Sequence, residues 1–224
     1  MRSVLALLYD IHGNLPALEA VLADAADAEE FLLGGDYATA GAWPRETVER
    51  LKELENATWI RGNADRWLVE RHDAPAPMDE IAARTAELLG DELDAELAEL
   101  PELTERGGRL YCHASPRSDM QSFGQEPGPL DADLLEGVDV KRVVFGHTHV
   151  QFRREGPNGI ELLNPGSVGM PWDGDHRAAY AVIDGDHVEC RRVEYDWEAS
   201  VAAVRERVGE LPARRMELAR FDVS

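Results

Sequence analysis

Aspartate, asparagine and histidine side chains recur along this sequence at one kind of position, directly after a short apolar run. Two of these positions carry pairs of the form D-x-H and H-x-H, and alternate residues of an extended segment point in the same direction. Because the carboxyl ends of strands in an α/β sheet converge on one crevice, all of these side chains can meet there. The set consists of Asp10, His12, Asp36, Asn63, His113, His147 and His149.

This set of oxygen and nitrogen donors predicts a metal centre. Mixed carboxylate and imidazole ligands suit manganese, iron, zinc, nickel or cobalt better than calcium. Seven donors are more than one ion with an open coordination position can use, so we expect two divalent metal ions that share a carboxylate. Manganese is the first choice, and magnesium is a further alternative. Taken singly, Asp10 and Asp36 also fit turn residues, and His113 also fits a buried structural histidine.

Five blocks of the sequence resemble the calcineurin-like metallophosphoesterase superfamily, in particular its small bacterial and archaeal phosphodiesterase-type members. The blocks occur in the family order and span nearly the whole chain: Asp10-Ile11-His12-Gly13-Asn14, Gly35-Asp36, Gly62-Asn63, His113 and Gly146-His147-Thr148-His149. The turn at residues 164–169 (N-P-G-S-V-G) also resembles one that follows the last block in those members.

The resemblance implies a role for each residue of the set. Asp10, His12 and His149 would hold one metal ion. Asn63, His113 and His147 would hold the other. Asp36 would bridge the two ions, and a hydroxide between them would attack phosphorus in line. The resemblance also implies a catalytic role for three of these ligands, Asp36, Asn63 and His147.

Two blocks depart from the family pattern. Many members carry a histidine after G-N that binds phosphate and protonates the leaving group, whereas this chain has Ala64. General acid help is typically worth about 10²–10⁴ in rate, so its absence favours substrates with good leaving groups. The stretch Gly35–Gly41 also lacks the arginine with which protein phosphatases hold phosphate. Asp65 is expected to cap the following helix, and Arg61 could either contact phosphate or be structural.

Short apolar runs that alternate with helical patterns predict βα units, and the later runs predict an antiparallel part. Strands are expected at residues 4–9, 30–33, 58–61, 110–113 and 143–145, and antiparallel strands at 151–154, 160–163, 179–183 and 188–193. Helices are expected at residues 15–28, 45–54, most of 65–100, and from 197 onward. With the resemblance, the fold class is α/β (α+β in part): a four-layer αββα sandwich of two mixed β-sheets flanked by helices, in one domain over residues 1–224.

Composition limits the partners of this chain. A net charge of −21 repels polyanions, so no nucleic-acid polymer is expected as a partner. No apolar run approaches the roughly 20 residues that span a bilayer, so no membrane partner is expected and a cytoplasmic location is predicted. The two cysteines, Cys112 and Cys190, are too far apart for a metal-binding C-x-x-C motif and are expected to be reduced and mostly buried.

These observations make a metal-dependent phosphodiesterase acting on small phosphodiesters, such as a cyclic nucleotide, the leading hypothesis. A small phosphoester substrate is therefore the expected partner. A phosphomonoesterase or a nucleoside polyphosphate hydrolase would use the same site. A non-catalytic metal-binding scaffold is the alternative from another class. The sequence names neither the substrate nor the oligomeric state.

Overall fold

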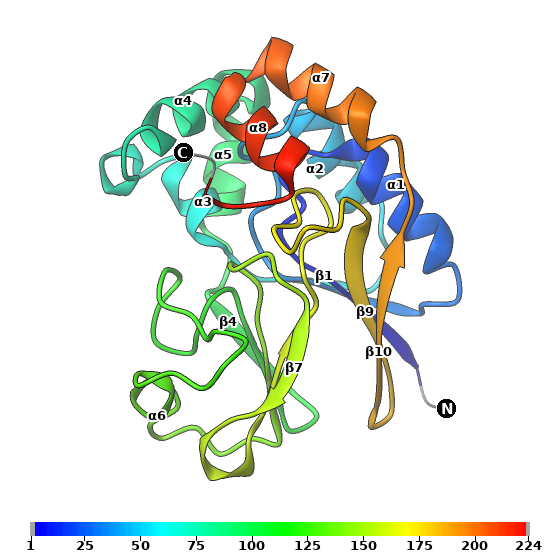
Figure 1. Ribbon diagram of the computed structural model, residues 1–224, viewed down its shortest axis with the longest axis vertical. Coiled ribbons are helices and arrows are strands. Elements are labelled where there is room, and N and C mark those ends of the chain that lie inside the picture. The colour runs from blue at the N-terminus through cyan, green and yellow to red at the C-terminus, as the bar shows by residue number, and fades with distance from the viewer. Residues whose placement is uncertain (1–2, 223–224) are drawn as a thin grey trace.

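Two five-stranded β-sheets form the centre of the structure, and helices flank them (Figure 1). The computed structural model describes residues 3–222, so the ends of the predicted 1–224 domain lie outside the described residues. The first sheet has the order β10-β9-β1-β2-β3 and contains β1 Val4–Leu8, β2 Glu30–Leu33, β3 Ala57–Trp59, β9 Ala178–Asp184 and β10 His187–Val193. The second has the order β4-β5-β6-β8-β7 and contains β4 Leu103–Arg106, β5 Arg109–Cys112, β6 Arg142–Val144, β7 Phe152–Glu155 and β8 Glu161–Asn164.

Both sheets are mixed, as predicted. In the first sheet β1, β2 and β3 run parallel, and β9 pairs antiparallel with both β1 and β10. In the second sheet β5, β6 and β8 run parallel, and β4 and β7 add antiparallel edges. The expectation that the last four strands form one antiparallel part is wrong, because β7 and β8 join the second sheet while β9 and β10 join the first. Pairing between strands far apart in sequence decides this, and local patterns do not report it.

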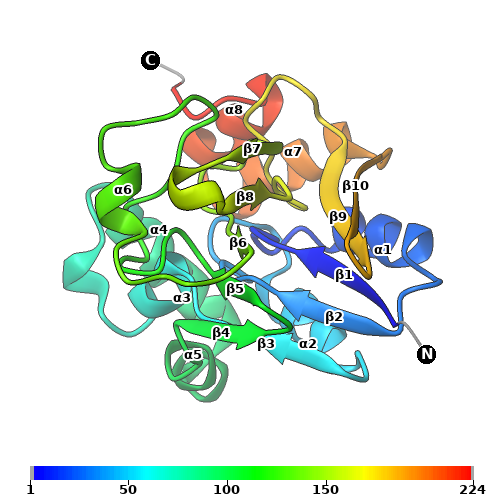
Figure 2. The same cartoon turned by 90° about the horizontal axis from the view of Figure 1, so that it is seen from below.

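The helices lie mainly against the first sheet. They are α1 Leu15–Asp24, α2 Pro44–Lys52, α3 Asn63–Trp67, α4 Met78–Leu89, α5 Asp91–Ala98, α6 Asp131–Leu134, α7 Trp197–Arg207 and α8 Glu210–Leu218. The predicted helical stretch 65–100 is thus several short helices, with a 3₁₀ turn at Arg71–Asp73 among them. Figure 2 shows α1 and α2 beside the first sheet and α6 beside the second. Among residues 3–222, no helix is long and apolar enough to cross a membrane.

Three layers of apolar side chains hold this arrangement together. Strand β1 is buried on both faces: Ala6 and Leu8 belong to the cluster under the helices, and Leu7 belongs to the cluster between the sheets. Such continuous burial explains why residues 4–9 read as an apolar run without alternation. A third cluster lies between the second sheet and the segment around α6 and includes Phe123 and Leu134. Cys112 is buried, but Cys190 is exposed, so the prediction of two mostly buried thiols is wrong for Cys190.

Candidate metal centre

All seven predicted residues lie where strands end, and the structure brings them together. Asp10 and His12 follow β1, and Asp36 follows β2. Asn63 begins α3, just after β3, and His113 follows β5. The last two, His147 and His149, follow β6. Six of the seven are buried, and His147 is half-buried.

Four of these residues could hold one metal ion. One donor atom from each of Asp10, His12, Asp36 and His149 lies within 4.8 Å of the other three. Nδ1 of His12 is 2.7 Å from the Thr39 carbonyl, and Nδ1 of His149 is 2.6 Å from the Met170 carbonyl. A carbonyl only accepts, so each ring carries its proton on Nδ1 and presents a lone pair on Nε2.

These lone pairs point at one another. The two Nε2 atoms are 3.1 Å apart, and Asp10 Oδ1 is 3.4 Å from Nε2 of His149. Asp10 Oδ1 is buried and has no hydrogen-bond partner within residues 3–222. Burial raises the pKa of Asp10 well above its usual value, and a cation among these side chains would offset both that burial and the repulsion between the two Nε2 lone pairs. The donor set therefore fits a divalent ion with mixed nitrogen and oxygen ligands.

The other three residues form a second group of donors beside the first. Nδ1 of His113 donates to the Gly34 carbonyl at 2.8 Å, and its Nε2 lies 3.0 Å from Asn63 Oδ1. Asn63 Oδ1 is also 2.8 Å from Nδ1 of His147. With the amide turned over, Asn63 would instead donate to both rings. With the oxygen inward and His113 deprotonated, three acceptors would converge, as a second cation requires.

Asp36 lies between the two groups. Its Oδ2 is 3.8 Å from Nε2 of His12 and 3.5 Å from Nε2 of His113. Its other oxygen, Oδ1, accepts a hydrogen bond of 2.9 Å from the backbone N–H of Ala64. Burial raises the pKa of this carboxyl, but the charges of His113 and His12 and the hydrogen bonds from His113 and Ala64 together outweigh burial and hold the pKa below its usual range. An ionised carboxylate facing both groups is suited to be shared by two ions.

The protonation of the histidines favours metal binding at three of the four rings. Burial lowers the pKa of His12 and His149, and burial with the charge of His113 lowers the pKa of His147 to about 4. These rings are therefore neutral near pH 7, the form that binds metals. Burial also acts to lower the pKa of His113, but the charges of Asp36 and Asp10 raise it to about 10. His113 is thus the ring that a bound cation would have to deprotonate.

The backbone at five of the seven positions is left-handed. The φ angles are positive at Asp10 (54°), His12 (49°), Asp36 (58°), His147 (64°) and His149 (56°). Such a conformation costs a residue other than glycine about 1–3 kcal/mol, and it persists only where the surroundings enforce it. Here the loops enforce it on each other: the N–H of Asp10 donates to the Gly35 carbonyl, and that of His12 to the Asp36 carbonyl.

The turn at residues 164–169 holds the first and last blocks in place. The Ser167 hydroxyl donates to the Asp10 carbonyl at 2.7 Å, and the Gly169 N–H donates to the same carbonyl at 3.1 Å. The Asn164 amide donates to the Gly146 carbonyl at 2.8 Å. The sequence resemblance singled out this turn, and the structure shows that it orders the loops that carry Asp10 and His147.

Asp65 and Arg61, which lie beside the positions that depart from the family pattern, have structural contacts here. The Asp65 carboxylate accepts hydrogen bonds from the N–H groups of Gly62, Asp36 and Tyr37, which confirms its capping role and extends it to the second block. Burial and the charge of Asp36 raise the pKa of Asp65 to about 7. Arg61 donates to the Ala98 carbonyl and pairs with Glu102, which favours its structural interpretation.

Sequence reasoning missed Trp172, a neighbour of the metal centre. Its ring stacks on that of His149, with centroids 3.6 Å apart and planes 13° apart. The backbone N–H of Trp172 donates to the His149 carbonyl. An isolated tryptophan 23 positions after His149 carries no sequence signal for this contact.

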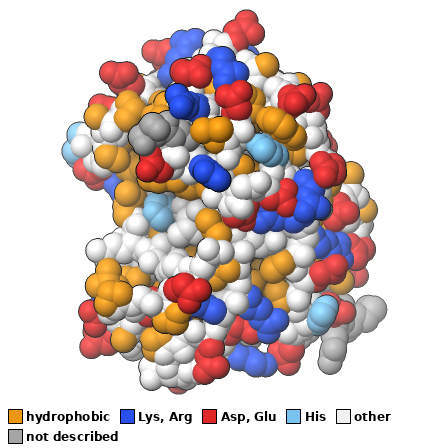
Figure 3. Space-filling model, viewed as in Figure 1, with side chains coloured by type: hydrophobic (Ala, Val, Ile, Leu, Met, Phe, Trp, Pro, Cys, Tyr) orange, Lys and Arg blue, Asp and Glu red, His pale blue; other side chains and the backbone are white. Residues whose placement is uncertain are grey.

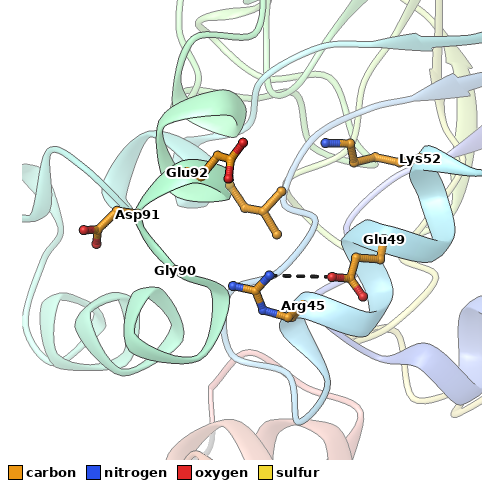
Figure 4. Close-up of a pocket in the computed structure, with 7 residues that line it drawn as sticks. Arg45, Glu49, Lys52, Gly90, Asp91 and Glu92 are labelled. Carbon is orange, nitrogen blue, oxygen red and sulfur yellow. Dashed lines mark ion pairs between the residues drawn. The ribbon is translucent and has the colours of Figure 1, made fainter.

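One pocket of the described surface lies away from these residues. It has a volume of about 450 Å³ and is lined by Arg45, Glu49 and Lys52 of α2 and by residues 90–93, and Figure 4 shows Arg45 directed at Glu49. None of the seven predicted residues lines it. A small cavity of about 20 Å³ reaches His113. Figure 3 shows a hollow between the helical half and the half that contains the second sheet, with a histidine surface at its edge.

Comparison with known proteins agrees with this architecture. The calcineurin-like phosphoesterase superfamily domain matches residues 4–187. An uncharacterised protein of Methanocaldococcus jannaschii is 30% identical, with 98% of this chain and 100% of the relative covered. Phosphodiesterase YfcE of Escherichia coli is 28% identical over 79% of this chain and 85% of its own length. The crystal structure of a metallophosphoesterase from Sphaerobacter thermophilus superposes with a TM-score of 0.83 at 29% identity, covering 96% of this chain and 99% of the other. This protein therefore belongs to the calcineurin-like phosphoesterase superfamily.

Proposed function

We propose that this protein is a metal-dependent phosphodiesterase that hydrolyses small phosphodiesters. One observation carries the proposal: the ionised Asp36 carboxylate lies between two groups of converging side chains that are types of metal ligand. Membership of a phosphoesterase superfamily gives this arrangement a reaction class.

The donor groups suggest how two divalent ions, with manganese as the first choice, would be held. We assign Asp10, His12 and His149 to one ion, and Asn63, His113 and His147 to the other. Asp36 would be shared by both. Such ions, when bound, generate a nucleophile from water and stabilise the charge of the phosphoryl group. The three neutral rings and the two carboxylates would hold the ions, and the loop hydrogen bonds keep these side chains in place.

The absence of a proton donor at position 64 supports a diesterase. Ala64 packs in an apolar cluster with Trp67 and Ala82, and only its backbone N–H faces the centre, through Asp36. A leaving group must then depart with little proton transfer, which favours esters of acidic alcohols and phenols. The relative YfcE is named a phosphodiesterase, which agrees with this preference.

The charge of the molecule supports a small substrate. A chain with 44 acidic and 23 basic residues repels nucleic-acid polymers and anionic membranes. A small phosphodiester meets less of this repulsion because only its phosphate must approach the centre. The cytoplasmic location stays a prediction of the sequence.

Activity and metal content test the proposal together. Manganese-loaded protein should bind two ions and cleave bis(p-nitrophenyl) phosphate faster than p-nitrophenyl phosphate. Asp36→Asn should lose bound metal and about 100-fold or more of kcat/KM, because metal catalysis contributes several kcal/mol to such reactions. Asp133→Asn, an exposed aspartate of α6, is the matched control and should behave as the wild type.

Three results would count against the proposal. A faster reaction with the monoester would favour a phosphomonoesterase. Loaded protein that holds two ions but cleaves neither ester would favour a scaffold. Unchanged activity in Asp36→Asn would place the chemistry elsewhere.

A further inference from the structure

Arg215, on α8, is connected to the candidate metal centre through Trp172. The guanidinium lies 5.8 Å from the ring centroid of Trp172, and Trp172 stacks on His149. A continuous run of contacts therefore joins Arg215 to a predicted metal ligand.

The surroundings of Arg215 are apolar. Its guanidinium lies 4.4 Å from the ring centroid of Phe221, donates to the Phe221 carbonyl, and contacts the sulfur of Met78. Burial lowers its pKa. Carboxylate partners have the opposite effect on Arg66 and Arg205, whose pKa values they raise. In a chain with a net charge of −21, a half-buried arginine held mainly by rings and a carbonyl is suited to meet an anion from outside.

The packing of α8 explains how it comes to lie here. Ala40 and Met216 belong to one apolar cluster, together with Met170, so α8 covers the loop that follows Asp36. That loop, Gly35–Gly41, contains no lysine or arginine. The small side chain of Ala40 leaves room for α8, and α8 brings Arg215 to a region where the loop supplies no cation.

We propose that Arg215 contacts the phosphate of the substrate, and so determines the affinity of the centre for phosphoesters. The proposal rests on the function proposed above. A guanidinium can donate two parallel hydrogen bonds to phosphate oxygens, and a partly apolar setting strengthens them. The ligand class is a phosphate group carried by a small molecule, and inorganic phosphate is its simplest probe.

Titration with inorganic phosphate tests this contact without relying on turnover. Manganese-loaded wild type, Arg215→Gln, Arg215→Lys and Arg214→Gln are compared by isothermal titration calorimetry. Arg214 is exposed and adjacent on the same helix, so it matches the change in net charge. Arg215→Gln should weaken phosphate binding about 10- to 100-fold, the effect of losing a hydrogen bond between charged groups. Arg215→Lys should retain part of the affinity, because lysine keeps the positive charge but cannot donate two parallel hydrogen bonds from one planar group.

Metal analysis and thermal unfolding of each variant exclude indirect effects. The proposal requires Arg215→Gln to keep the metal content of the wild type, and Arg214→Gln to keep its phosphate affinity. Wild-type affinity in Arg215→Gln, or an equal loss in Arg214→Gln, would overturn it. Should Arg215→Gln not fold, Arg215→Lys decides: it must bind phosphate more weakly than the wild type.

Esterase assays on the same samples separate this inference from the proposed function. Phosphate binding that depends on Arg215 in a wild type without esterase activity would refute the function and leave the contact standing. Diester hydrolysis with a KM unchanged in Arg215→Gln would refute the contact and leave the function standing.

Discussion

At the scale of single residues, Gly62 decides how closely the chain can approach Asp36. A Cβ atom at Gly62 would lie 2.1 Å from Asp36 Oδ1 and 2.6 Å from its backbone nitrogen. Neither atom can move freely, because Oδ1 accepts from the Ala64 N–H and the backbone nitrogen donates to Asp65. The requirement for glycine before Asn63 is therefore steric.

Substitution of Gly62 by alanine should displace Asp36. We expect Gly62→Ala to lose bound metal and to lower the free energy of unfolding by about 1–3 kcal/mol, the usual cost of overpacking. Gly124→Ala is the control, since its added Cβ would meet its nearest neighbour at an ordinary 3.5 Å. Metal analysis and denaturant unfolding measure both effects. Normal metal content in Gly62→Ala would show that Asp36 tolerates the shift.

Residue types and order sufficed to predict which seven side chains converge. They did not predict what orients these side chains. The carbonyls of Thr39, Met170 and Gly34 fix the histidine tautomers, and every residue has a carbonyl, so no pattern distinguishes them. Asp65 accepts three backbone N–H groups, whereas the sequence indicated only a helix cap.

At the scale of elements, two helix caps differ in what else they contact. Asn14 caps α1 by accepting from the Ala17 N–H, and its amide also donates to the Gly169 carbonyl at 2.8 Å. Asp196 caps α7 by accepting from the Ala199 N–H. Gly169 in turn donates to the Asp10 carbonyl, so the side chain of Asn14 contacts a residue that is bonded to the metal centre, whereas the side chain of Asp196 accepts from the first turn of its own helix.

The two caps should therefore separate stability from metal affinity. Asn14→Ala and Asp196→Ala should each lower the free energy of unfolding by about 1 kcal/mol, the usual value of such a cap. Only Asn14→Ala should also weaken manganese binding, measured by calorimetry, because it releases the loop that holds Asp10. Equal manganese affinity in both variants would mean that the Gly169 contact does not position the loop.

The apolar runs of the sequence predicted most helices and strands to within a few residues, but they did not predict two kinds of element. Strand β4, Leu103–Arg106, is an edge strand that is largely exposed, so it has no apolar face to reveal it. Helix α6, Asp131–Leu134, is only four residues long, too short for a helical period to show. Both are elements whose stability comes from neighbours rather than from their own sequence.

At the scale of the whole molecule, metal binding should stabilise the fold. A ligand present at 100 times its Kd adds about 2.7 kcal/mol to the free energy of unfolding. For a chain of this size that corresponds to a rise in Tm of about 5–10 °C, at roughly 2–4 °C per kcal/mol. Circular dichroism melts with manganese and with a chelator, at constant ionic strength, measure the shift.

The Asp36→Asn variant is the control for this measurement. Its melting temperature should respond less to manganese than that of the wild type. If the Tm of the wild type changes with neither manganese nor chelator, the assignment of the converging donors to metal ions is contradicted.

The sheet architecture was predictable only through the resemblance. Parallel βα units could be read from the first half of the chain, but nothing local indicates that β9 returns to pair with β1. That pairing joins residues about 175 positions apart in the register of Leu5 with Ile183. Long-range contacts of this kind are specified by burial in the finished fold, which local patterns do not contain.

The position of β1 between β2 and β9 has a consequence for how the protein is made. The strand that leads into Asp10 is synthesised first, yet one of its two neighbours is among the last strands to be synthesised. Until residue 184 has left the ribosome, the side of β1 that pairs with β9 has no partner strand. Until residue 170 has left the ribosome, neither the turn at 164–169 nor the Met170 carbonyl can order the loops that carry the donors. A growing chain therefore carries all seven donors well before it can offer them to an ion as one site.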